Sequence, residues 1–147
     1  MKLKIPHECL VLVCDGRKAL FLRNQGDDVY PNLRVQRVFQ APENPKTSEI
    51  GSDKPGRAFM LRQRSAVEQF NWHDAAELAF ADEVAKTVNA AYLNATLEAV
   101  VVAAPPRTLA ELRERFSDGV KKVILAEINK DLTKHPVYEI EQHLTAA

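Results

Sequence analysis

The stretch VVVAAPPRTLAELRERF, residues 100–116, constrains the fold more than any other part of this chain. It belongs to a run, residues 97–104, that is apolar without the alternation of a half-exposed strand. Such a run is typical of a strand buried on both faces of a sheet. Pro105 and Pro106 end it, because proline cannot donate a hydrogen bond to a sheet ladder. The chain should therefore build a sheet around this strand and cover both faces.

The sequence after the two prolines predicts two helices and one more strand. Thr108 is expected to begin a helix, with Glu111 three residues later completing a capping box. Val123–Ile128 is a strand candidate, although GVKKVILAEINKDL also suits a helix. Pro136 suits the first turn of a C-terminal helix, with His135 before it as the cap. That helix would continue through Val137, Ile140, Glu141 and Leu144.

The N-terminal 40 residues predict three strands that follow one another antiparallel. Glu8–Cys14 is strongly apolar, Asp15-Gly16 is a favoured two-residue turn, and Lys18–Arg23 returns as a second strand. LRVQRVFQ, residues 33–40, follows as a third strand. Its alternation breaks at Val38-Phe39, which indicates a β-bulge.

Residues 41–71 differ in composition, with three prolines, two glycines and no sustained hydrophobic period. A loop of this length in a compact domain is usually functional or disordered. The segment from Trp72 to Thr96 then predicts the clearest helix, with Asn71 or His73-Asp74 as its cap. Its apolar stripe recurs at helical spacing and comprises Leu78, Ala81, Val84, Ala85, Val88, Ala91, Tyr92 and Ala95.

The expected order is therefore β-β-β-α-β-α-β-α. Three meandering strands followed by two right-handed crossovers give a mixed five-stranded sheet with helices on both faces, the plan of a ribonuclease-H-like α/β fold. The length of 147 residues and an apolar content of 46% suit a single domain spanning 1–147 with a long loop at 41–71.

Charge and apolar patterning limit the functional classes. The net charge is zero, but residues 1–70 carry 12 basic and 8 acidic side chains, and residues 71–147 carry 8 and 12. A global polyanion-binding signature is thus absent, and the first half of the chain has the charge for a local one. The sequence contains no run of about 18 apolar residues, so membrane insertion is not expected. The N-terminus lacks the small cleavage-site residues of a leader, which indicates a cytoplasmic protein.

Cys9 and Cys14 are five residues apart, an odd spacing that places two strand residues on opposite faces. Such cysteines cannot form a disulfide with each other. They are expected to be buried free thiols.

The first candidate site is the corner after residues 97–104. Ligands of open α/β sheets bind beyond the carboxyl ends of parallel strands, where the N–H groups of a following helix attract anions. Arg107 and Thr108 lie at this corner and are candidate anion ligands. Against this, Pro105 and Pro106 remove two donors and Thr108 is expected to cap the helix. The alternative is a purely structural corner.

The second candidate site is the basic stretch that contains Lys54, Arg57, Arg62 and Arg64 with no acidic residue between them. Phe59 lies within it, and Phe70 and Trp72 follow. Cations interleaved with aromatic side chains are typical of surfaces that bind single-stranded nucleic acid. The alternative is a solvated loop without a ligand.

Other chemistry has weaker signals. Asp15, Glu98 and Asp131 are the only carboxylates that we could assign to a ribonuclease-H-like metal site, and such chemistry requires that they converge. His7, His73, His135 and His143 are scattered without zinc spacing. No phosphate-binding loop or nucleophile elbow is present in the sequence. We therefore expect no metal, no cofactor and no catalytic residue.

Three stretches together resemble a bacterial family described as required for attachment to host cells: VLVCDGRKALFLRNQG, VVVAAPPRTLAELRERF and INKDLTKHPVYEI. FNWHDAAELAFADEVAKTVN is similar to that family's central helix. The resemblance runs from about Cys9 to Leu144. It implies a relationship with the middle domain of archaeal and eukaryotic peptide-chain release factors, which has a ribonuclease-H-like sheet.

The resemblance does not imply peptide-release activity, because the Gly-Gly-Gln tripeptide of those factors is absent from this sequence. Three hypotheses follow. The chain is a non-enzymatic module that binds RNA, tRNA or the ribosome; or a protein-interaction factor in attachment; or a metal-dependent nuclease or hydrolase. The sequence does not predict an oligomeric state.

Overall fold

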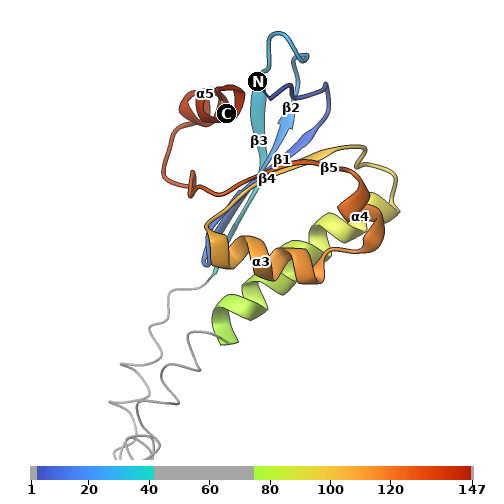
Figure 1. Ribbon diagram of the computed structural model, residues 1–147, viewed down its shortest axis with the longest axis vertical. Coiled ribbons are helices and arrows are strands. Elements are labelled where there is room, and N and C mark those ends of the chain that lie inside the picture. The colour runs from blue at the N-terminus through green and yellow to red at the C-terminus, as the bar shows by residue number, and fades with distance from the viewer. Residues whose placement is uncertain (1–2, 42–74, 147) are drawn as a thin grey trace, which may run out of the picture.

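Five strands form one mixed sheet in the order β3-β2-β1-β4-β5 (Figure 1). The computed structural model describes residues 3–41 and 75–146. The strands are β1 (Leu10–Cys14), β2 (Lys18–Asn24), β3 (Leu33–Gln40), β4 (Val100–Ala103) and β5 (Ile124–Ile128). The chain is helical over 75–93, and α3 (Pro106–Arg115), α4 (Asp118–Lys122) and α5 (Val137–Thr145) follow.

The expected mixed five-stranded α/β sheet is confirmed. β1 pairs antiparallel with β2 and β2 with β3, whereas β1 is parallel to β4 and β4 to β5. This strand order is compatible with the ribonuclease-H-like plan. The strand at 124–128 is present, which resolves the choice between strand and helix there. The short helix α4 was not predicted. Within the described residues, no helix is long and apolar enough to cross a membrane.

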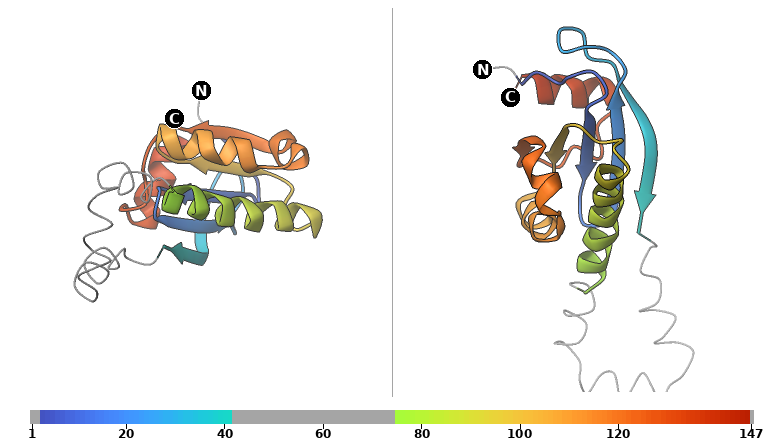
Figure 2. Two further views of the ribbon diagram at one scale, coloured as in Figure 1. Left: turned by 90° about the horizontal axis from the view of Figure 1, so that it is seen from below. Right: turned by 90° about the vertical axis from the view of Figure 1, so that its right-hand side faces the viewer.

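The core has two layers, one on each face of the sheet. Helix 75–93, α3 and α4 cover one face, where Leu12, Val84 and Leu112 belong to one buried cluster. Helix 75–93 and α3 run side by side (Figures 1 and 2), and Asn89 joins them by donating to the Arg115 carbonyl. α5 packs on the opposite face, where Ile140 and Leu144 are buried. β4 is completely buried, as its unbroken apolar run predicts.

The predicted apolar stripe of the long helix is confirmed over its central part. Ala81, Val84, Ala85 and Val88 are all buried. Leu78 is an exception, since its exposed fraction is 37%, and Phe80 is buried instead. Ala95 does not extend the stripe, because its φ of 58° lies in the left-handed region that ends a helix. The expected caps at 71–74 lie outside the described residues.

Two helix starts differ from the predictions. α3 begins at Pro106, so the predicted capping box at Thr108 is wrong: Thr108 lies inside the first turn, and Glu111 contacts Arg107 instead. Proline suits the first helical position because its fixed φ is helical and its missing N–H would be unpaired there. At α5 the N-cap is Pro136 and not His135.

The first turn and the bulge are each displaced slightly from their predicted positions. Gly16 and Arg17 form the two-residue loop, because the Asp15 N–H bonds the Lys18 carbonyl. The Asp15 carboxylate accepts hydrogen bonds from the N–H groups of Arg17 and Lys18, each at 2.7 Å. The bulge lies at Gln36, since Phe21 pairs with Arg37 and Leu22 with Val35.

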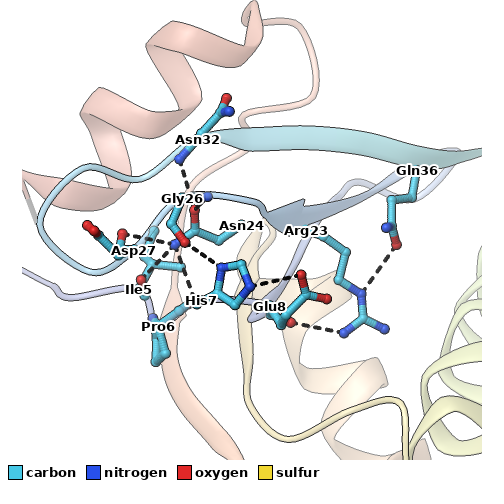
Figure 3. A network of polar contacts seen from close by, with 10 residues as sticks. All are labelled: Ile5, Pro6, His7, Glu8, Arg23, Asn24, Gly26, Asp27, Asn32 and Gln36. Atoms are coloured by element: carbon cyan, nitrogen blue, oxygen red, sulfur yellow. Dashed lines mark hydrogen bonds and ion pairs between the residues drawn. The ribbon is translucent and has the colours of Figure 1, made fainter.

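A buried asparagine ties the N-terminal segment to the β2–β3 connection (Figure 3). Asn24 is fully buried. Its side-chain nitrogen donates to the carbonyl oxygens of Ile5, Pro6 and Asp27. Its side-chain oxygen accepts from the N–H groups of Gly26 and Asn32. One amide side chain thus lies within hydrogen-bond distance of five backbone groups, with its two N–H hydrogens shared among the three carbonyl oxygens.

We predict that Asn24→Ala lowers the free energy of unfolding by about 3 kcal/mol, because buried backbone groups lose their partner. Urea unfolding followed by circular dichroism measures this difference. Gln25→Ala is the matched control, since Gln25 is the exposed neighbour. A loss below about 1 kcal/mol, the typical net value of a single hydrogen bond, would contradict this role of Asn24.

Candidate functional site

The carboxyl ends of β1, β4 and β5 lie at one edge of the sheet, because these three strands are parallel. Residues that follow the strands therefore gather there: Asp15 after β1, Arg107 after β4 and Asp131 after β5. Open α/β sheets place their ligand sites at such an edge. We call these residues and their direct contacts the carboxyl-edge cluster.

Thr133 links two carboxylates of this cluster. Its hydroxyl lies 2.6 Å from Asp131 Oδ1 and 3.2 Å from Asp15 Oδ2. Thr133 is buried, with an exposed fraction of 4%, and its N–H also bonds Asp131 Oδ1 at 3.0 Å. Because a hydroxyl has one hydrogen to donate, the nearer Asp131 oxygen receives it. Asp15 and Asp131 are both candidate carboxylates in the sequence, whereas no sequence pattern indicates that Thr133 links them.

Glu98 does not join the other two carboxylates. It precedes Val100, which pairs with Leu10 at the start of β1, whereas Asp15 follows the end of β1. Glu98 therefore lies at the opposite end of the parallel strands. Among residues 3–41 and 75–146, no group of three or more His, Cys, Asp or Glu side chains is placed to hold a metal ion.

Arg107 lies between acidic side chains at the corner. Its Nε is 3.3 Å from Glu111 Oε1, and its Nη1 is 3.8 Å from Glu77 Oε2. The Arg107 side chain is 57% exposed, so these pairs are partly screened by water. Thr108 is buried and makes no side-chain cap. An anion at this corner would have to compete with two carboxylates for the guanidinium.

Glu77 was missed by sequence reasoning, and a glycine explains how it comes close. A Cβ atom added to Gly16 would lie 3.0 Å from the Glu77 carboxyl carbon. That separation is tighter than normal packing, so glycine lets the helix side chain approach the β1–β2 turn. In the sequence, Asp15-Gly16 indicates only a turn, and the approach of Glu77 to Gly16 is visible only in the structure.

The predicted basic residues Lys54, Arg57, Arg62 and Arg64 lie outside the described residues. Three of the four histidines are described, and they lie in two places. His7 Nδ1 is 2.7 Å from the Gly26 carbonyl oxygen (Figure 3). His135 Nδ1 is 2.8 Å from Glu139 Oε2, and the His135 and His143 rings are 4.9 Å apart between centroids.

Both cysteines are buried free thiols on opposite faces of the sheet, as their spacing predicts. Burial raises the pKa of Cys9 to about 11, which nearby Arg23 partly opposes. Burial, together with the negative charges of Asp15 and Asp131, raises the pKa of Cys14 to about 12. Since the thiolate is the nucleophile, neither side chain is prepared for nucleophilic catalysis at neutral pH.

We predict that neither thiol of the folded protein reacts with Ellman's reagent at about pH 8, because both pKa values lie well above that pH. Two thiols per chain should react once denaturant is added. Absorbance of the released thionitrobenzoate gives both numbers. Reaction of one thiol in the folded protein at the rate of free cysteine would contradict the burial of that side chain.

The fold and this edge define a mixed α/β domain in which side chains converge beyond three parallel strands. A family model described as "Protein required for attachment to host cells" matches residues 10–144. The chain therefore belongs to the host attachment protein family. No curated protein gives a significant match.

Proposed function

We propose that this host attachment family protein is a non-enzymatic, cytoplasmic module that binds RNA, tRNA or the ribosome, and that it affects attachment indirectly. Lys54, Arg57, Arg62 and Arg64 contact phosphates in this proposal, and Arg107 with Thr108 assists at the carboxyl edge. The relationship with the middle domain of release factors, which the family resemblance implies, supports a partner in translation.

The observation that carries the proposal is the separation of charge along the chain. Residues 1–70 have a net charge of +4 and residues 71–147 of −4. β3 belongs to the basic half and lies at an edge of the sheet, with two arginines and no acidic residue. It is followed in sequence by the stretch that holds the four basic residues. Cations concentrated on one part of a neutral protein are the electrostatic feature of polyanion binding.

The alternative functions have less support. A protein partner is favoured by Val29 and Tyr30 between β2 and β3, whose exposed fractions are 67% and 78%. A metal-dependent nuclease or hydrolase is disfavoured by the position of Glu98, since two-metal chemistry needs converging carboxylates. Asp15 and Asp131 approach one another, but both are engaged in hydrogen bonds within the protein.

We predict that the protein co-sediments with RNA or ribosomes at low salt and that the Arg57→Ala, Arg62→Ala, Arg64→Ala triple variant does not. Binding should weaken steeply as salt rises, because each phosphate contact releases counterions. Lys121→Ala with Lys122→Ala serves as the control, because it removes two exposed cations from α4. Absence of binding at low salt would exclude this function and favour a protein partner.

A further inference from the structure

The bulge at Gln36 brings two arginines of β3 onto the same face of the sheet. Arg34 pairs with Arg23, and Arg37 pairs with Phe21. Arg23 and Phe21 are two residues apart on β2, and thus point to the same face, as do the β3 residues paired with them. Without the extra residue, Arg34 and Arg37, three positions apart, would point to opposite faces.

The resulting surface consists of Arg23, Arg34, Arg37 and Phe39, and we call it the arginine face. It lies on β2 and β3 at the outer edge of the sheet (Figures 1 and 2). Arg34 and Arg37 are exposed, and Arg23 and Phe39 are half-buried. Two arginines directly opposite each other on neighbouring strands repel and destabilise a sheet. Stability of the fold alone therefore does not explain the Arg23–Arg34 pair.

Neutral groups hold two of these guanidinium groups in place. Arg23 donates to Gln36 Oε1 at 3.3 Å and to the Glu8 carbonyl oxygen at 3.0 Å (Figure 3). The Arg37 guanidinium carbon lies 4.3 Å from the centre of the Phe39 ring, a cation–π distance. Phe39 is itself fixed by an edge-on contact with Phe21. Among the described residues, no carboxylate forms an ion pair with Arg23, Arg34 or Arg37.

We propose that the arginine face binds the phosphate backbone of single-stranded RNA. This inference rests on the RNA-binding function proposed above and adds contact residues other than those at positions 54–64. A guanidinium group can donate two parallel hydrogen bonds to a phosphate. Its plane can also stack on an unpaired base. Because Arg23 and Arg37 are already ordered by neutral partners, they lose little side-chain freedom when a phosphate binds. RNA would also relieve the repulsion between Arg23 and Arg34.

The same bulge disfavours a protein strand added to this edge. A peptide that extends a sheet needs a regular row of outward N–H and C=O groups. The extra residue at Gln36 interrupts that row in the middle of the eight-residue strand β3. A ligand recognised through side chains and negative charge fits this surface better than one recognised through its backbone.

Fluorescence anisotropy with a labelled oligouridylate tests the inference on the full chain. We expect Arg34→Ala with Arg37→Ala to weaken binding at least about tenfold at low salt and to reduce the log–log salt slope by about 1.4, the value for two lost contacts to a single strand. Arg34→Lys with Arg37→Lys should retain most of the salt slope, because the charges remain. Lys121→Ala with Lys122→Ala, which removes the same charge elsewhere, should leave affinity within about twofold.

The outcomes separate this inference from the proposed function. Wild-type affinity in the Arg34/Arg37 alanine variant, with binding lost in the Arg57/Arg62/Arg64 variant, would overturn the arginine face and leave the RNA function standing. No binding by the wild-type protein would overturn both. Equal binding of a poly-glutamate peptide would assign the face to acidic protein segments and overturn the RNA assignment. Thermal unfolding midpoints of all variants show whether a loss reflects unfolding.

Discussion

The pairing of β1 between β2 and β4 is the constraint on which the rest of the structure depends. Every residue of β1 is buried, and its side chains alternate between the two core layers. Its backbone forms an antiparallel ladder on one side and a parallel ladder on the other. The parallel ladder requires a long crossover, which helix 75–93 provides. It also brings the ends of β1 and β4 to one edge, where Asp15 and Arg107 lie.

Among the described residues, the β3 edge and the carboxyl edge also differ in how their cations are paired. The meander β1-β2-β3 uses the basic half of the chain and ends at a sheet edge, far in strand order from β5. At the carboxyl edge, in contrast, Arg107 is paired with Glu77 and Glu111, and Asp15 and Asp131 both lie within hydrogen-bond distance of Thr133. We therefore expect a polyanion to prefer the arginine face, whose cations form no ion pair with a described carboxylate, over Arg107 at the corner, which pairs with two carboxylates. The topology of the sheet thus suggests a ligand site at the carboxyl edge, whereas the distribution of cations without an ion pair among the described residues favours the arginine face.

Elements set by local chemistry could be predicted from the sequence, and contacts set by register could not. The buried strand before Pro105, the meander and the opposite-facing cysteines follow from apolar patterning and spacing. The predicted start of α3 was wrong, because the helix begins at Pro106 and Thr108 is therefore not its N-cap. The contact between Asp15 and the Asp131 loop is made by Thr133, and the arginine face depends on one extra residue at Gln36. Strict alternation along β3 predicts that Arg34 and Arg37 point to opposite faces of the sheet. Only the pairing with β2 shows that they point to the same face.

Hydrogen–deuterium exchange with and without a single-stranded RNA tests the central claim, that the basic half of the chain meets the polyanion, most directly. The account predicts slower exchange on RNA binding in peptides that cover Leu33–Gln40 and positions 54–64. It predicts unchanged exchange in α4 and β5. Protection confined to peptides around Asp15 and Asp131–Thr133, with none on β3, would contradict the account and would assign the ligand site to the carboxyl edge.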